Sequence, residues 1–404
     1  MATTKPIISG GFSFETQEEM LDIKPQSAKL TIGIPKEVVL QENRVALIPE
    51  AINVLVNNGH EVIVETKAGE GSKYSDRDFS EAGAQIALKK KDVYKAPILI
   101  KSAPVMGDDL PFLQLNQTII SPIHLSMLKK ELVEKMMDKK ITGLGFENLK
   151  DDSGTYPIVR CMSEIAGSAA MLIAGQYLGS RENGRGVLLG GISGIPPTKV
   201  IIIGAGVVGE FATRTALAMG ASVKVFDNNV YRLKRLQNNL GMRVWTSVME
   251  PRILAKQLKT CEVAVGALTN QGGRSPIVVT EEMVEAMRPG SVIIDVSIDR
   301  GGCFETSEIT THQHPTFVKH GVIHYCVPNI PSGYARTASH AISNVLMPLL
   351  LEACDAGGIE EMMWHDFNLR NGVYMYRGHL TDLYISQRFD LKFTDLNLLI
   401  ASKR

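Results

Sequence analysis

Cysteine is scarce in this 404-residue sequence, and the few cysteines that occur are widely spaced. There are five, no two of them form a CxxC pair, and their number is odd. This pattern argues against a disulfide framework and against a cysteine-built zinc site, and it fits reduced thiols in a cytoplasmic protein. The five are Cys161, Cys261, Cys303, Cys326 and Cys354.

Net charge is lacking as well, because Lys plus Arg and Asp plus Glu both number 43. Without an overall field the chain does not attract nucleic acid or an anionic membrane, so we expect small molecules or further copies of the chain as partners. No uninterrupted apolar run reaches the roughly 18 residues of a membrane helix, so we expect no membrane partner. Residues 1–29 lack the basic head and apolar stretch of a secretion signal, and we interpret them as a surface arm.

What the sequence does contain is a regular alternation of strand-like and helix-like segments. β-branched runs alternate with amphipathic stretches from residue 30 to about residue 147, and again from Lys199 to Asn329. Strand, helix and strand in this order imply parallel sheets with helical crossovers. Two long helices of small and apolar residues are predicted, one from Ser163 to Gly179 with Ser163 as its cap, and one over residues 335–354.

The chain length exceeds the ~250 to 300 residues at which a single core usually stops growing, so we expect two domains. The economical arrangement inserts a second domain into the first and uses the two long helices as the connections. The tail, residues 355–404, is interpreted as helical, polar and too short to form a domain.

The segment KVIIIGAGVVGEFATRTALAMGASVKVFD places a GxGxxG motif between a strand and a helix. A lone GxGxxG is weak evidence, but here the whole context of a dinucleotide site is present. Gly204 would make the tight turn and Gly206 would admit a pyrophosphate at the helix N-terminus. Gly209 would let helix and strand pack closely. The alternative is a tight glycine turn in some other α/β domain.

The strand after this helix ends in Asp227, a position that accepts hydrogen bonds from the ribose hydroxyls of a dinucleotide. A carboxylate there repels a 2′-phosphate and favours NAD over NADP. Arg232 is near enough to meet such a phosphate and weakens that preference.

Polar residues at the ends of predicted strands are the candidates for chemistry. A nicotinamide enzyme needs a group that binds the substrate and an acid or base for the proton that accompanies the hydride. Arg44 suits a substrate carboxylate, and Lys101 and His124 each end a strand. Asp299 follows a strand of the nucleotide domain, at the edge where ligands bind in such sheets. Taken alone, Arg44 also fits a surface arginine and His124 a core histidine.

The stretch IIDVSIDRGGCFETSEITTHQHPT gathers carboxylates, a cysteine and histidines, which raises a metal or redox site as an alternative. Alternation along the strand would put Asp295 and Asp299 on one face, with only Asp299 reaching the cofactor. We interpret Asp295 as a structural carboxylate and His312 and His314 as turn or packing residues. The sequence therefore predicts proton handling at Asp299 and no metal site.

Taken together, several motifs resemble the alanine dehydrogenase and transhydrogenase nucleotide-domain family. They occur in the family's order, from about residue 30 into the C-terminal tail: IGIPKE, ENRVALIPE, IHLSML, MSEIAG, GRGVLLGGISG, GAGVVG, DVSIDRGGCFETS and HYCVPNIP. The resemblance implies an α/β fold of two Rossmann-like domains, with an NAD-binding domain inserted into a discontinuous substrate domain. The implied divisions are an arm over 1–29, a substrate domain over 30–160 and 337–404, and an NAD-binding domain over 161–336.

The resemblance implies NAD-dependent oxidative deamination of L-alanine to pyruvate and ammonium by a homo-oligomer, often a hexamer. Arg44 would bind the substrate carboxylate, His124 would act as acid and base, and Asp299 would lie beside the nicotinamide. The related transhydrogenase domains lack a histidine at the position of His124, so its presence favours a dehydrogenase. The cofactor contacts implied by motif and resemblance together are Ser163, Gly204, Gly206, Val207, Val208, Gly209, Asp227, Arg232 and Asn329.

Departures from the family pattern concentrate in the substrate pocket. KSAPV stands where the family has KVKEP, so Ala103 replaces the substrate lysine and only Lys101, on the same strand face, remains. Arg160 is a candidate replacement cation, Arg300 stands where glutamine is usual, and ALTNQGGRSP replaces an apolar loop. Two alternatives stay open: a transhydrogenase-like NAD(H)-binding subunit, and a dehydrogenase acting on another small amino or imino acid.

Overall fold

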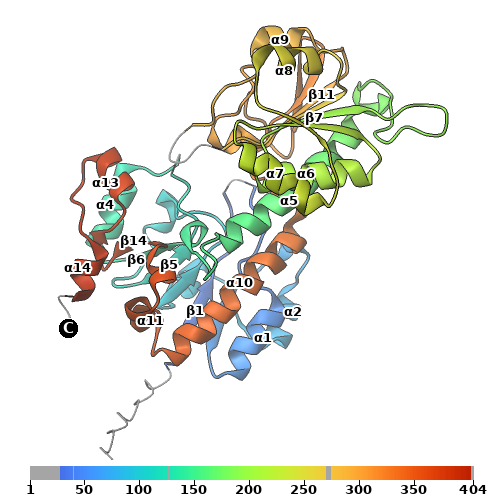
Figure 1. Ribbon diagram of the computed structural model, residues 1–404. Coiled ribbons are helices and arrows are strands. Elements are labelled where there is room, and N and C mark those ends of the chain that lie inside the picture. The colour runs from blue at the N-terminus through green and yellow to red at the C-terminus, as the bar shows by residue number, and fades with distance from the viewer. Residues whose placement is uncertain (1–27, 40, 126, 270–273, 402–404) are drawn as a thin grey trace, which may run out of the picture.

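The structure, a computed structural model, describes residues 28–39, 41–125, 127–269 and 274–401. Most of the N-terminal arm, up to residue 27, and part of the polar loop, residues 270–273, lie outside this range. Figure 1 shows two lobes, each built around a sheet, with the long helices α5 and α10 side by side at their junction.

The first domain contains an eight-stranded sheet in the order β15-β14-β6-β5-β4-β1-β2-β3. Strands β1 to β6 are parallel, and β14 and β15 add an antiparallel edge. The strands are β1 Thr31–Ile34, β2 Glu61–Glu65, β3 Gln85–Ala87, β4 Ile98–Ile100, β5 Thr118–Ser121, β6 Thr142–Gly145, β14 Val373–Tyr376 and β15 His379–Leu380. Its helices are α1 Pro49–Asn57, α2 Asp76–Glu81, α3 Lys90–Val93 and α4 Lys130–Asp138.

The C-terminal tail returns to this first sheet. It carries α11 Ile359–His365, α12 Phe367–Arg370, α13 Leu383–Phe389 and α14 Leu396–Ala401. The expectation of a purely helical tail is wrong, because β14 pairs with β6 and is fully buried. The tail therefore completes the first domain, and the second domain is inserted within it, as the sequence predicts.

The second domain contains a seven-stranded sheet in the order β12-β13-β11-β10-β7-β8-β9, with only β12 antiparallel. The strand order reverses direction between β7 and β10, which is the switch point where Rossmann sheets bind dinucleotides. The strands are β7 Lys199–Ile203, β8 Ser222–Phe226, β9 Trp245–Ser247, β10 Val263–Gly266, β11 Val292–Asp295, β12 Thr316–Lys319 and β13 Val322–Tyr325. The helices are α6 Val207–Ala218, α7 Val230–Leu240, α8 Pro251–Leu258 and α9 Glu281–Glu285.

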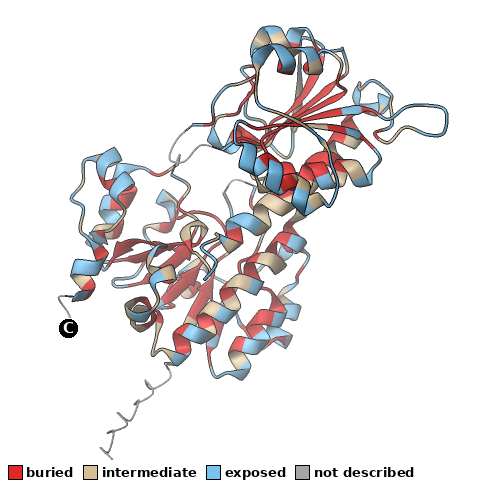
Figure 2. Cartoon of the chain, viewed as in Figure 1, coloured by how far each residue is buried: buried red, intermediate tan, exposed pale blue. Residues whose placement is uncertain are grey.

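Both sheets are buried on their two faces. Separate apolar clusters cover the two sides of each sheet, and Figure 2 shows the central strands as buried segments within a partly exposed shell of helices. Continuous β-branched runs such as Lys199–Ile203 are the sequence signature of strands in this position.

The long helices are α5 Pro157–Tyr177 and α10 Ala335–Asp355. The predicted start of α5 at Ser163 is wrong: Tyr156 precedes the first turn, Pro157 occupies a position that favours proline, and Ser163 lies inside the helix. Gly167 lets α5 lie close to α6, because a Cβ there would stand 2.3 Å from the Val208 carbonyl oxygen.

By length and composition α5 could cross a membrane, with a mean hydropathy of 1.4, and the bent pair Ile330–Asp355 and Ile359–His365 passes the same test. This differs from the expectation drawn from uninterrupted apolar runs. In the fold, α5 packs against α6 and α10, which gives its apolar residues a place in the protein core.

Candidate active site

The loop between β7 and α6 has the geometry of a dinucleotide-binding turn. Gly204 has a φ of +115°, and a Cβ there would lie 2.4 Å from the Ala267 carbonyl oxygen. A Cβ on Gly209 would lie 1.9 Å from the Gly204 oxygen, so both positions require glycine. A Cβ on Gly206 would meet no protein atom within 4 Å. The open space above Gly206, at the N-terminus of α6, fits a pyrophosphate.

Asp227 borders this loop from the end of β8. Its carboxylate is buried and accepts hydrogen bonds from the backbone amides of Ala205 and Asn229, both at 2.7 Å. Val207 and Val208 are half-buried in the first turn of α6, and Arg232 is exposed in the first turn of α7. The residues present therefore fit a dinucleotide whose ribose lies at Asp227.

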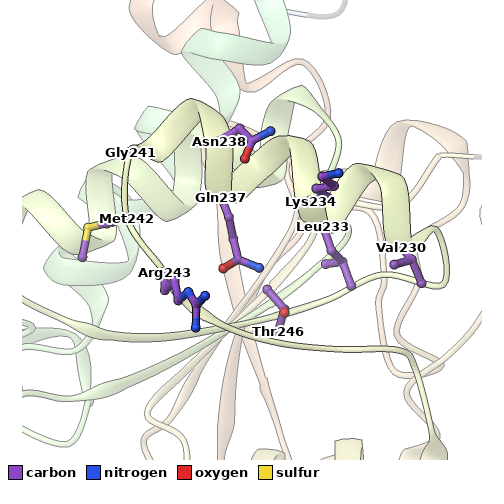
Figure 3. A pocket seen from close by; sticks show the side chains of 9 residues that line it. All are labelled: Val230, Leu233, Lys234, Gln237, Asn238, Gly241, Met242, Arg243 and Thr246. Atoms are coloured by element: carbon purple, nitrogen blue, oxygen red, sulfur yellow. The ribbon is translucent and has the colours of Figure 1, made fainter.

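A separate open groove of about 760 Å³ runs between α7 and the chain leading into β9. Figure 3 shows its lining, which includes Lys234, Gln237, Arg243 and Thr246. No candidate residue lines this groove.

Arg44 lies in the loop after β1, where a neighbouring carboxylate orients it. Its Nε donates to Glu42 Oε1 at 2.7 Å and its Nη2 donates to Glu42 Oε2, which makes a bidentate pair. The remaining Nη1 lies 3.2 Å from the sulfur of Met162 on α5. Burial raises the pKa of Glu42, but the charge of Arg44 and the hydrogen bonds from Arg44 and Asn329 together outweigh this effect and lower it. Glu42 is therefore ionised at neutral pH.

His124 follows β5 by three residues and has a left-handed backbone with a φ of 49°. The preceding amide, of Ile123, donates to Glu147 Oε1 at 2.7 Å. Glu147 comes shortly after β6, the parallel neighbour of β5, so both loops emerge at the same sheet edge. Burial lowers the pKa of His124, and a neutral imidazole that can accept a proton results at pH 7.

Asp299 lies in a 3-10 turn, Val296–Arg300, and the expected strand alternation through it is wrong because β11 ends at Asp295. Asp299 keeps contact with solvent, and its Oδ1 accepts a hydrogen bond from the Asn329 amide at 3.0 Å. Surrounding protein displaces water and raises the pKa of Asp299, while the charges of His124 and Arg44 oppose this. Side chains of both domains thus act on one carboxylate.

Lys101, predicted to assist Arg44, is occupied elsewhere. Its Nζ is buried between Glu37, at 2.9 Å, and Asp109, at 3.5 Å. Ala103 is buried and offers only a methyl group. These contacts favour a structural role for Lys101 and leave no ammonium at the position of the family's substrate lysine.

Arg160, predicted as a replacement cation, pairs with Glu164 one turn along α5 at 3.0 Å, and its side chain is 49% exposed. Met162, two residues on, contacts Arg44. Two residues rotate a helix by about 200°, so Arg160 faces away from Arg44. Ser163, predicted as a cofactor contact, is half-buried beside Met162.

The cluster around Asp295 is structural, as interpreted from the sequence. The buried carboxylate accepts hydrogen bonds from the amides of Ser297 and Cys303 and from the Ser307 hydroxyl. His312 lies 3.3 Å from the Asn329 carbonyl oxygen. Within the described parts of the chain, no group of three or more His, Cys, Asp or Glu side chains is arranged to hold a metal ion.

Sequence reasoning missed Glu42 and Glu147. Glu42 stands two positions before Arg44 in the segment QENR, and this close spacing of opposite charges was the available signal for their ion pair. Asn329, predicted as a cofactor contact, donates its side-chain amide to Glu42 Oε2 at 3.0 Å, across the two domains. Nothing in the sequence connects these two residues.

Known proteins of similar sequence and structure cover nearly the whole chain. Alanine dehydrogenase 2 of Staphylococcus aureus (strain USA300) is 36% identical over 365 residues, which are 90% of this chain and 98% of the relative. A solved structure of an L-alanine dehydrogenase matches with a TM-score of 0.84 at 35% identity, covering 89% of this chain and 99% of that one. The transhydrogenase of Sinorhizobium meliloti, at 23% identity and a TM-score of 0.74, covers 87% and 99% and shares the fold.

Two family models match in tandem. The model described as alanine dehydrogenase/PNT, N-terminal domain, matches residues 33–166, and the one described as alanine dehydrogenase/PNT, C-terminal domain, matches residues 170–382. Together with the near-complete coverage of the relatives, these matches show that the chain belongs to the alanine dehydrogenase/PNT family.

Proposed function

We propose that this protein is an NAD-dependent alanine dehydrogenase that reversibly converts L-alanine to pyruvate and ammonium. The observation that carries the proposal is that Arg44 and His124, from the first domain, lie near enough to Asp299, from the second, for their charges to influence one another. The family membership and the names of the relatives support the same reaction.

The glycine loop and Asp227 would hold NAD, which would supply the acceptor for the hydride that leaves the substrate α-carbon. Arg44 holds the substrate carboxylate through the edge of its guanidinium not taken by Glu42. His124, neutral at pH 7, takes the proton from the amine or from attacking water and returns it as ammonia leaves. Asp299 stabilises the cationic imine of the substrate by its negative charge. Arg160 and Lys101 are left out of this scheme because of their contacts.

The cofactor preference rests on Asp227, whose buried carboxylate stands where a 2′-phosphate would enter. We propose Ser163, Gly204, Gly206, Val207, Val208, Gly209 and Asp227 as the cofactor contacts. Asn329, predicted as another, is left out because its side-chain amide and backbone amide donate to Glu42 and Asp299. Arg232, exposed in the first turn of α7, is a further candidate for contact with the adenosine end of the cofactor. NADPH is expected to replace NADH poorly.

The engagement of Lys101 by two carboxylates gives the alternative functions their support. A site with Arg44 as its cation and no lysine would suit a different small amino or imino acid. A transhydrogenase-like NAD(H)-binding subunit would need no lysine for substrate binding at all. Oxidation of NADH across a panel of 2-oxo acids with ammonium separates these cases, because a transhydrogenase-like subunit instead exchanges hydride between two nicotinamide nucleotides.

The decisive assay follows NADH oxidation with pyruvate and ammonium. Wild-type protein should be active, while His124→Ala and Asp299→Ala should each lose about 100-fold or more in kcat and still bind NADH. His314→Ala is the matched control, because His314 is exposed and its backbone amide is bonded within its own loop, to the hydroxyl of Thr311. An inactive wild-type protein with every 2-oxo acid tested would refute the proposal.

We also propose that the protein works in the cytoplasm as a homo-oligomer, a hexamer by resemblance. The loop from Gly184 to Thr198 projects from the second lobe (Figure 1), and Ile192 and Ile195 within it form an isolated antiparallel β-bridge. It exposes 68% of Leu188, 63% of Ile192 and 59% of Ile195, which favours coverage by another copy. Light scattering after gel filtration measures the assembly.

We propose that the substrate domain comprises residues 30–160 and 337–404, and that the NAD-binding domain comprises residues 161–336.

A further inference from the structure

One carboxylate oxygen is shared between the two domains. Glu42 Oε2 accepts hydrogen bonds from Arg44 Nη2 and from the side-chain amide of Asn329, the latter at 3.0 Å. Its partner oxygen accepts from the Nε of Arg44 and from the Arg44 backbone amide, at 2.7 and 2.9 Å. Glu42 has a side chain only 2% exposed, so it depends on these donors in place of water.

The same asparagine holds the proposed catalytic carboxylate. The Asn329 backbone amide donates to Asp299 Oδ1 at 3.0 Å, and its carbonyl accepts from the Ser332 amide at 2.9 Å. Its backbone is left-handed, with φ 55° and ψ 47°, a conformation that asparagine tolerates better than most residues. Its side chain and main chain therefore point at different partners, one in each domain.

His124 lies within reach of the charges of Asp299, Arg44 and Glu42. Burial lowers the pKa of His124, Asp299 and Glu42 raise it, and Arg44 lowers it. A substrate carboxylate that binds Arg44 must share the guanidinium with Glu42, and the side-chain amide of Asn329 is a donor to Glu42 that does not belong to Arg44. The substrate-binding guanidinium of Arg44, the imidazole of His124 and the carboxylate of Asp299 are thus all influenced by the hydrogen-bonded pair of Glu42 and Asn329.

We infer that Glu42 and Asn329 are positioning residues that couple the substrate-binding Arg44 to Asp299 across the two domains. The inference rests on the proposed function, since it concerns the same reaction. Glu42 fixes the direction of the Arg44 guanidinium. Asn329 positions Asp299 relative to that guanidinium when the two domains are in contact.

The test uses Asn329→Gly in the full-length enzyme. Glycine keeps the left-handed backbone and the amide to Asp299 but removes the donor to Glu42. We expect kcat to fall about tenfold or more, the loss of one charge-assisted hydrogen bond, with NADH affinity unchanged. Ser332→Ala is the matched control, because the Ser332 hydroxyl also bridges the domains, to Asn43 and Gln41, without contacting Arg44 or Asp299.

Glu42→Gln gives a second readout. In alanine oxidation, kcat/KM falls at low pH where the base His124 becomes protonated. Loss of the Glu42 charge should move this fall to lower pH, since Glu42 is one of the groups that raise the pKa of His124. The double variant should lose no more activity than the worse single variant, as expected for residues acting through one bond.

Three results would overturn the inference: weaker NADH binding by Asn329→Gly with kcat retained at saturating NADH, an equal loss in Ser332→Ala, or additive losses in the double variant. The first would make Asn329 a cofactor contact, and the second would make this contact ordinary domain docking. An inactive wild-type protein is a different outcome, because it refutes the proposed function itself.

Discussion

Lys101 and Glu37 form a buried ion pair, with Nζ 2.9 Å from Oε2 and both side chains no more than 5% exposed. The other oxygen of Glu37 accepts the backbone amides of Ser102 and Ala103, at 2.7 and 3.0 Å. The pair thus ties the loop after β4 to the loop after β1, beside Arg44. Lys101, predicted from sequence as a substrate ligand, thus helps to hold these two loops together in the fold.

Removal of this lysine should harm stability more than substrate binding. Lys101→Met leaves Glu37 buried without its cation, and such losses cost about 3 to 5 kcal/mol. Urea denaturation should show the decrease, whereas Lys95→Met, at an exposed pair with Asp92, should change little. A well-folded Lys101→Met protein whose KM for pyruvate has risen at least about tenfold would restore Lys101 as a substrate ligand.

Glu147 should act on catalysis through the loop of His124. Its carboxylate accepts the Ile123 amide, and this contact supports the left-handed backbone of the next residue. We expect Glu147→Ala to lower kcat by about tenfold or more with NADH affinity unchanged, because the loop loses its acceptor. Glu147→Gln keeps a carbonyl acceptor and should retain most activity. Equal losses in the two variants would show that the charge matters instead of the acceptor.

Two glycines of the loop between β7 and α6 should differ in how their replacement affects NADH binding and stability. Gly206→Ala introduces a Cβ into open space at an ordinary φ of −76°, so the melting temperature should stay constant while NADH affinity falls about tenfold. Gly209→Ala forces a Cβ to within 1.9 Å of the Gly204 oxygen and should lower both. Calorimetry of NADH binding and of unfolding measures the two effects. Unchanged NADH affinity in Gly206→Ala would place the pyrophosphate elsewhere.

His324 should make the fold sensitive to acid. It is buried, stacks on Phe317, lies 2.8 Å from the Thr306 hydroxyl, and burial lowers its pKa to about 4. The unfolded chain binds this proton near pH 6.5, so from about pH 6.5 down to about 4 only the unfolded state takes it up. Stability should therefore fall across this window as the pH falls, by about 3 kcal/mol from this group.

The variant that tests this assignment is His324→Asn, which cannot titrate. It should be less stable than wild type at pH 7, because packing is lost, yet show a shallower decline of the unfolding free energy between pH 6.5 and 4. A decline as steep as in the wild type would assign the acid sensitivity to other groups.

Much of the architecture was predictable because its causes are local. β-branched runs bounded by glycine form buried parallel strands, and the GxGxxG context specifies a turn whose steric demands involve only its near neighbours, as at Gly209. The start of α5 and the end of β11 were less accessible. Pro157 extended the helix beyond the predicted cap, and the 3-10 turn of Val296–Arg300 interrupted a strand alternation that the residues alone suggested.

The sequence by itself determined the two α/β domains, the dinucleotide loop and the residue types suited to the chemistry, since these depend on periodicity and short spacing. Only the tertiary structure decided which polar groups meet. Glu42 and Asn329 are 287 positions apart, and Lys101 and Glu37 are 64 apart. Whether a lysine binds substrate or a neighbouring carboxylate depends on which charges the folded chain buries together, because a buried charge must find its partner wherever the sheet edges and domains place one.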